Sequence, residues 1–137
     1  MRKRGAILAL LGLGLLLGGM VFFAAIMAPL VFTHLPLPVA GPFIRAAFPW
    51  YYLYMLVCSG LAALGLGLSR DVWPALIMLV IAGLTVWLWA YFLPVLDALR
   101  QAGNEPGFAR GHAIATWIDG GELFAVFLLF IRAAARG

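Results

Sequence analysis

The chain has 137 residues, of which 66% are hydrophobic and only 10% are charged. A soluble domain of this length would need far more polar surface, so the composition indicates an integral membrane protein and excludes a soluble globular enzyme. The formal net charge of +4 does not indicate nucleic-acid binding, because the basic residues lie near the ends of apolar segments rather than in one patch. The partner that the composition indicates is the lipid bilayer.

The first apolar segment covers residues 5–33 and follows three basic residues. Its uninterrupted apolar part, 6–28, is longer than the roughly 7–15 residues of a cleaved signal-peptide core. At about 1.5 Å per residue it is long enough to cross a bilayer, so we expect a retained transmembrane helix. Pro29 should kink this helix or loosen its last turns, because proline removes a backbone donor. Gly14 and Gly18 share one face and predict a close helix contact.

The second span should begin after an irregular connection. Residues 34–42 contain prolines and a glycine that predict a break, and residues 43–48 should form a short interfacial turn of helix. Aromatic residues cluster just beyond, a pattern typical of the headgroup boundary. We therefore place the second transmembrane helix at 48–68.

Two short connections frame the third span. Ser69, Arg70 and Asp71 form a tight turn suited to antiparallel helices, with Asp71 as the expected N-cap of a third helix over 72–97. The stretch QAGNEPG predicts a loop before a fourth helix over 108–132. The fold class expected is an all-α integral membrane protein, with four transmembrane helices in an antiparallel bundle and one transmembrane domain over residues 1–137.

The basic residues also predict an orientation. With four spans, both termini and the turn at 69–71 lie on one side, which then carries Arg2, Lys3, Arg4, Arg70, Arg132 and Arg136. The other side carries Arg45, Arg100 and Arg110. Because short cytoplasmic loops are enriched in Lys and Arg, we expect both termini to be cytoplasmic.

Asp119 and Glu122 lie near the middle of the fourth predicted helix, whereas the interiors of the other three helices carry no acid or base. A charged residue at the bilayer centre costs about 2.5–3.5 kcal/mol on insertion scales. These acids must therefore be protonated, contact water, bind a cation or meet a basic group of a partner. The pair, with His112 on the same broad helix face, is a candidate proton- or cation-binding site.

Structural explanations of the same residues stay open. The two acids could accept hydrogen bonds across a helix interface, for instance from Tyr54 or Thr85. Gly120 and Gly121 fit close helix packing better than an unwound ion site. The single cysteine, Cys58, lies in an apolar run and is expected to be a small buried hydrophobe.

The two histidines are expected at the same membrane level. His34 follows the first helix and His112 begins the fourth, so both should lie near the interface on the side opposite the termini. An interfacial position or a hydrogen bond at a helix end explains each of them. A haem site with two histidine ligands, or a copper site that adds methionines, is the alternative.

Short motifs distributed over the chain resemble a known family. The first span ends in GGMVFFAAIMAPLVF, the second begins with FPWYY, and FARGH opens the fourth helix. These motifs resemble an uncharacterised bacterial family of four-helix membrane proteins similar to eukaryotic transmembrane protein two-hundred-and-five. The resemblance implies a four-helix bundle in the bacterial cytoplasmic (inner) membrane and no established activity. Asp119 stands where members of that family commonly have Asn.

Three hypotheses about function follow. The first is proton or cation handling, as transport or in a metal-related role, through Asp119 and Glu122, in a homo-oligomer because four helices enclose little volume. The second is an accessory or structural subunit of a larger membrane complex, in which the acids meet a partner's basic group. The third is a membrane redox protein with haem or copper on His34 and His112. A hydrolase is not expected, because no activated serine or cysteine arrangement is visible.

Overall fold

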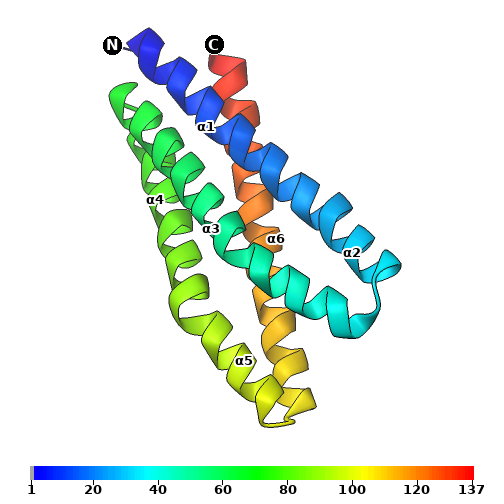
Figure 1. The fold of residues 1–137 in the computed structure, drawn as a ribbon. Coiled ribbons are helices and arrows are strands. Elements are labelled where there is room, and N and C mark those ends of the chain that lie inside the picture. Colours follow the sequence, from blue (N-terminus) through cyan, green and yellow to red (C-terminus); the bar gives the residue numbers. More distant parts are fainter. Residues whose placement is uncertain (1) are drawn as a thin grey trace.

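The computed structural model describes residues 2–137, and in this range all the regular structure is helical (Figure 1). The first span comprises α1 (Arg2–Phe22), the π-helical turn η1 (Phe23–Met27) and α2 (Ala28–His34), and the second is α3 (Leu37–Leu68). The third comprises α4 (Val72–Trp87), the π-helical turn η2 (Leu88–Phe92) and α5 (Leu93–Gln101), and the fourth is α6 (Glu105–Arg136). All four spans are long and apolar enough to cross a membrane. The predicted all-α membrane protein with four transmembrane helices is confirmed.

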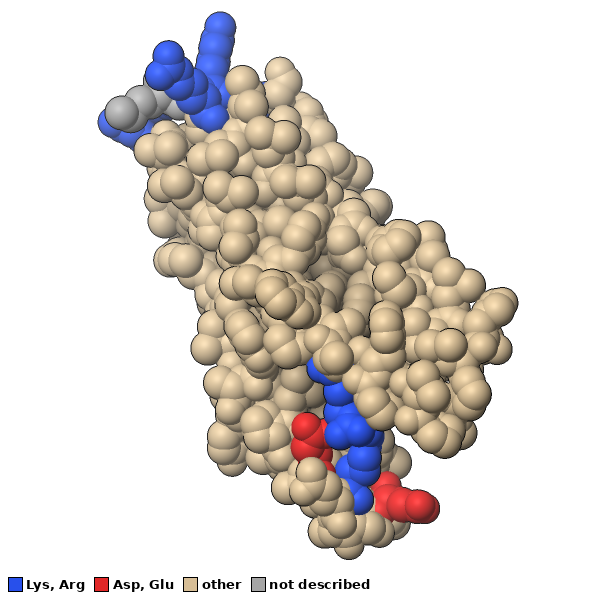
Figure 2. All heavy atoms as spheres, in the orientation of Figure 1, with Lys and Arg blue, Asp and Glu red and all other residues tan. Residues whose placement is uncertain are grey.

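The outer surface is apolar over most of its height. In the most apolar window of each span only 17–44% of the residues are buried, so most of the hydrophobic side chains face outward. Figure 2 shows Lys and Arg at the end that holds the N-terminus and in a hollow toward the opposite end, with a broad uncharged band between them. An apolar band flanked by charges is the surface that a bilayer requires.

Both termini and the α3–α4 turn lie at one end of the bundle, called here the terminal end; the α2–α3 and α5–α6 connections lie at the far end (Figure 1). α3 packs against both α1 and α4, and α1 also packs against α6, whereas α4 and α6 touch only slightly. The main core is built from buried residues of α1, α3, α4 and α6, among them Leu13, Leu16, Met55, Met78 and Val126. Toward the far end, α1–α2 and α3 spread away from α5 and α6 (Figure 1).

α1 and α3 meet along a seam of small residues. A Cβ added at Gly12 would strike the backbone nitrogen of Ala62 and lie 2.8 Å from its Cα. Gly65 meets the backbone of Ala9 in the same way. Cys58 is part of this seam and is buried, as expected for a small hydrophobe.

The close contact expected at Gly14 and Gly18 is absent, so that prediction was wrong. A Cβ at Gly14 would reach only the ring of Phe130, at 3.4 Å, and nothing lies within 4 Å at Gly18. The physical reason is the direction of each glycine on the helix: the seam follows Gly5, Ala9 and Gly12, spaced four and three residues apart, which share one face.

Two prolines each follow a π-helical turn, and neither ends its span. Each π-helical turn, η1 and η2, comes just before a proline at the start of the next helix, Pro29 in α2 and Pro94 in α5. The carbonyl four residues before each proline, of Ala25 or Ala90, therefore lies inside the wider turn, where the proline ring is accommodated. The loosening expected at Pro29 is confirmed in this form.

Several helices are longer than the sequence predicted. α3 begins at Leu37 rather than near residue 48, because Pro36 and Pro38 stand at its first positions, where a missing N–H costs nothing, and the helix continues through Pro42. The break is therefore confined to residues 35–36. The third span extends to Gln101, and α6 begins at Glu105, where the side chain of Asn104 accepts a hydrogen bond from the Gly107 N–H at 3.1 Å.

Asp71 stands at the N-cap position of α4, as expected, but its side chain does not cap the helix. Its carboxylate instead accepts hydrogen bonds from both terminal nitrogens of Arg132, that of Nη2 at 2.9 Å, and lies 3.3 Å from Arg136. This ion pair ties the α3–α4 turn to the last turns of α6. The side-chain cap that we predicted was wrong because a bidentate guanidinium is a stronger partner for the carboxylate than one backbone N–H.

Candidate functional site

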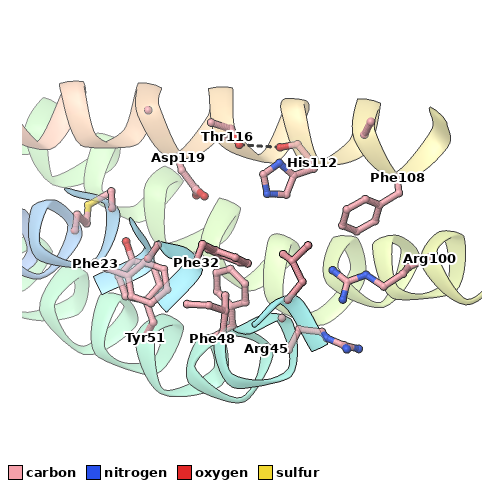
Figure 3. A pocket seen from close by; sticks show the side chains of 18 of the residues that line it. Phe23, Phe32, Arg45, Phe48, Tyr51, Arg100, Phe108, His112, Thr116 and Asp119 are labelled. Carbon is pink, nitrogen blue, oxygen red and sulfur yellow. Dashed lines mark hydrogen bonds between the residues drawn. The ribbon is translucent and has the colours of Figure 1, made fainter. Parts of the chain in front are cut away.

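A groove of about 1190 Å³ lies between α1–α2 and α3 on one side and α5 and α6 on the other (Figure 3). We call it the long groove. It extends from the far end of the bundle to mid-span, since its lining includes Arg100 and Glu105 at one end and Met20 and Leu123 at the other. Its walls are mainly aromatic and aliphatic, from Phe23, Phe32, Ile44, Phe48, Tyr51 and Phe108.

One face of α6 supplies the polar groups along the groove. His112, Thr116 and Asp119 are spaced four and three residues apart, so their side chains follow one stripe toward the middle of the span (Figure 3). The hydroxyl of Thr116 donates to the backbone carbonyl of His112 at 2.9 Å, so this hydrogen bond does not involve the imidazole ring. The stripe therefore leads from the groove mouth to a carboxyl group.

Asp119 lies where the long groove reaches mid-span. Its Oδ1 is buried and has no hydrogen-bond partner among the described residues. Figure 3 shows Tyr51 across the groove with its hydroxyl toward the α6 side, and its ring stacks on Phe23 with centroids 4.2 Å apart. The surroundings of this carboxyl are thus aromatic, with no basic side chain among the residues that line this part of the groove.

Glu122 faces a different cavity. A smaller groove of about 530 Å³, called here the short groove, lies between α4 and α6 and is lined by Trp73, Ile77, Leu84, Trp117, Gly121 and Glu122, with other apolar residues. Glu122 is only 4% exposed, and within residues 2–137 neither of its carboxyl oxygens has a hydrogen-bond partner. It is the only ionisable group in the lining of this groove.

The two grooves overlap in depth along α6 and extend from there in opposite directions. The long groove runs from the far end to Leu123, and the short groove runs from Trp117 toward Trp73, at the terminal end of α4. The two acids are three residues apart, which is about 4.5 Å along a helix. A buried carboxyl without a partner is stable only as the neutral acid or with a bound cation, because an isolated charge is costly in apolar surroundings. Each acid can therefore hold a proton, at the depth where the two grooves overlap.

The structure separates the four predicted site residues into three places. His112 and Asp119 line the long groove together, whereas Glu122 does not share their cavity. His34 is exposed at the end of α2 and its Nδ1 lies 2.9 Å from the hydroxyl of Thr33; it does not line the long groove. Across residues 2–137, no three His, Cys, Asp or Glu side chains come together as metal ligands.

The structural partners proposed for the acids are occupied elsewhere. The hydroxyl of Tyr54 donates to the carbonyl of Leu15 at 2.6 Å, and the hydroxyl of Thr85 donates to the carbonyl of Ile81 at 2.9 Å. Neither reaches Asp119 or Glu122. These two hydrogen-bond predictions were wrong: the hydroxyl of Thr85 bonds back to its own helix, and that of Tyr54 bonds across to a carbonyl of α1.

Gly120 and Gly121 fit neither of the two roles considered from the sequence, close helix packing or an unwound ion site. α6 remains a regular helix through them, so the backbone is not unwound. A Cβ at either position would meet nothing within 4 Å, so they do not serve close packing within this chain. They leave the surface beside the acids open.

Sequence reasoning missed Arg45, Arg100 and Tyr51 as groove residues. The two arginines were used only to predict orientation, and they lie 55 positions apart in the sequence. Their assignment to the same membrane side was the one available signal. That they face one groove depends on how α3 and α5 are packed.

The chain belongs to the family described as Domain of unknown function (DUF4149), whose model matches residues 11–105. The match covers the first span from residue 11 onward and the second and third spans, and it ends where α6 begins, so membership says nothing about Asp119 or Glu122. No curated protein and no solved structure matches the chain. The class supported by fold and family is therefore a four-helix membrane protein of a family without an assigned function.

Proposed function

We propose that the protein transfers protons, or binds a small cation in their place, through Asp119 and Glu122 in the middle of the membrane. One observation carries the proposal: Asp119 Oδ1 and both oxygens of Glu122 are buried without hydrogen-bond partners in the described chain, in two grooves that overlap in depth along α6 and extend in opposite directions. Intramembrane carboxyl groups are costly, and in membrane proteins they mark ion and proton pathways.

The proposed transfer has one step between the acids. A hydronium ion that enters the long groove along His112 and Thr116 donates a proton to the Asp119 carboxylate and becomes water. The O–H bond of Asp119 then breaks as a new O–H bond forms on Glu122, directly or through one water, and Glu122 releases the proton toward the short groove. The step is reversible, and the pH difference across the membrane sets its direction.

The cellular setting belongs to the same proposal. Six basic residues at the terminal end against three at the far end favour cytoplasmic termini in a bacterial inner membrane. The long groove then opens to the outside and the short groove toward the cytoplasm. The kinship with eukaryotic transmembrane protein two-hundred-and-five is part of this proposal, resting on the short motifs of the first, second and fourth spans.

Proton flux into proteoliposomes tests the proposal. A potassium diffusion potential drives the flux, and a pH-sensitive dye inside the vesicles reports it. We expect Asp119→Asn and Glu122→Gln each to lower the rate by about a hundredfold, the scale of losing a positioned proton-transfer group. Glu105→Gln is the matched control, because Glu105 lines the same groove at its mouth, where it is exposed. Flux equal to that of empty vesicles, or undiminished in the double variant, contradicts the proposal.

A second candidate is a subunit that packs against another membrane helix. The open surface at Gly120 and Gly121 favours it, since small residues allow helices to approach closely in membranes. The partner could be a second copy of this chain or another subunit whose basic group meets the acids. Disulfide cross-linking of a Gly121→Cys variant in a Cys58→Ala background tests the homo-oligomer. Cross-linked dimers support it, and monomers alone at high protein-to-lipid ratio contradict it.

A further inference from the structure

The mouth of the long groove combines two guanidinium groups with an apolar cavity. Arg45 of α3 and Arg100 of α5 both line it (Figure 3). Arg100 reaches across the groove, since its Nη1 lies 3.9 Å from the position of a Cβ at Gly41, one helical turn before Arg45. Two elements distant in the sequence thus bring positive charge to one place.

Neither arginine is strongly neutralised. Arg45 pairs with Asp97 at 3.6 Å, but both side chains are about 40% exposed, so the pair is long and wet. Arg100 stacks on the ring of Phe108 at 4.7 Å and takes part in none of the ion pairs formed among residues 2–137. Glu105 also lines the mouth, yet it pairs with neither arginine. Both guanidiniums are available to an anion.

The start of α3 adds a further positive contribution. Leu37 and Gly41, in its first turns, line the same groove, and the N-cap Pro36 makes no side-chain hydrogen bond to this helix end. The N-terminal end of a 32-residue helix carries partial positive charge, although the N–H groups of Val39 and Ala40 already donate to the carbonyl of Pro36. A phosphate between Arg45 and Arg100 would face this helix end.

The cavity below this mouth is suited to an alkyl chain. From Phe108, which contacts Arg100, to Asp119 the groove follows eleven residues of α6, about 16 Å of helix. Opposite His112 and Thr116 of α6, the walls on this path are apolar and comprise Phe23, Ala24, Ala28, Phe32 and Phe48. The volume of about 1190 Å³ exceeds the roughly 300–1,000 Å³ of pockets for drug-sized ligands. A free phosphate would leave nearly all of it empty.

We propose that the long groove binds an anionic phospholipid, with its phosphate between Arg45 and Arg100 and one acyl chain in the apolar cavity toward Asp119. The membrane supplies this molecule at the depth where the two arginines lie. The inference rests on the groove mouth and walls rather than on the carboxyl groups. A bound acyl chain would exclude water from the groove, so proton transfer through it would require the lipid to leave.

Lipid retention measured by native mass spectrometry tests the proposal. The purified protein is exchanged into mixed micelles containing phosphatidylglycerol and phosphatidylcholine with the same chains. We expect one retained phosphatidylglycerol with clear preference over phosphatidylcholine. Arg45→Gln and Arg100→Gln should each weaken that preference roughly tenfold, the scale of one charge-assisted contact. The double variant Arg45→Lys/Arg100→Lys should retain part of the preference for phosphatidylglycerol. Arg110→Gln should leave the preference unchanged, because Arg110 does not line the groove.

A second pair of variants tests the position of the chain. Ala24→Trp places a large side chain in the groove, whereas Ala25→Trp, one residue on, lies outside its lining. We expect lipid loss only in Ala24→Trp, with unchanged thermal unfolding in both. Equal retention of the two lipids by the wild type, a preference that survives the double Gln variant, or retention insensitive to Ala24→Trp overturns the proposal. So does competition by inorganic phosphate alone as effective as by phosphatidylglycerol, since that would indicate a free anion site.

Discussion

At the scale of single residues, the charged groups of this protein divide by depth. Asp71, in the α3–α4 turn at the membrane surface, meets Arg132 and Arg136, and the hydrogen bonds from Arg132 hold the pKa of its carboxyl below the usual value, against the opposing effect of burial. Asp119 and Glu122, at mid-span, meet no cation in the described chain. The surface acid is therefore a structural group, whereas the two deep acids cost stability and call for a functional explanation.

The ion pair of Asp71 predicts both a stability loss and a pH dependence. Asp71→Asn should lower the free energy of unfolding by about 1–2 kcal/mol, the scale of a partly exposed bidentate ion pair. Because the folded-state pKa is lowered, the contribution is complete above the unfolded value of about 3.9 and is lost as the pH falls through the folded value. Thermal unfolding in detergent at neutral pH and below about pH 4 measures the stability loss and its pH dependence. The difference in stability between wild type and Asp71→Asn should shrink in acid.

Asp97→Asn is the control for that measurement. Asp97 forms only the longer, exposed pair with Arg45, which should contribute less than about 0.5 kcal/mol. A loss in Asp97→Asn as large as in Asp71→Asn would show that the bidentate geometry is not the cause.

At the scale of helices, close approach depends on which glycines face a neighbour. α1 contains five glycines, and only the face with Gly5 and Gly12 meets the backbone of α3 at full contact, while Gly19 meets the ring of Tyr54. In a membrane, where lipid competes equally for apolar side chains, such backbone approach is a main source of helix association. The seam therefore holds α1 against α3.

Gly12→Ala tests the seam. The added Cβ would lie 2.8 Å from Cα of Ala62 and 2.9 Å from the carbonyl oxygen of Cys58, and backbone atoms cannot move aside as a flexible side chain can. We expect a loss of about 1–3 kcal/mol in unfolding free energy, as for overpacked cores. Gly18→Ala, on the same helix with nothing within 4 Å, should be neutral. Denaturant titration compares the two, and equal stabilities would contradict a close backbone seam.

At the scale of the whole molecule, the topology decides which groove opens to which side. Both termini lie at the terminal end, which carries six of the nine basic residues. This imbalance favours cytoplasmic termini, and with them a long groove open to the outside.

Reporter fusions measure this orientation. A fluorescent protein fused after Gly137 should be fluorescent in cells, and alkaline phosphatase at the same position should be inactive, because that enzyme needs the oxidising periplasm. Alkaline phosphatase inserted at Gly103, in the α5–α6 connection, should be active. The opposite pattern at both positions would reverse the assignment of the two grooves.

The sequence alone determined the architecture. Four apolar segments separated by short polar connections predict four membrane helices, because the bilayer requires every backbone group to be bonded within its own helix. The isolated acids of the last span were equally visible, since nothing else in the interior of any span carries a charge. The start of α3 was misplaced because Pro36 and Pro38 indicate a break by composition, although proline fits the first turn of a helix.

Only the tertiary structure decided how the spans face one another. Helical periodicity places His112, Asp119 and Glu122 on one broad face, but whether such a face borders one cavity or two depends on the helices packed beside it. Here the neighbours divide the face, so that Asp119 lines the long groove and Glu122 the short one. The convergence of Arg45 and Arg100 is likewise a property of packing, because no local pattern encodes the angle at which the far ends of α3 and α5 lie.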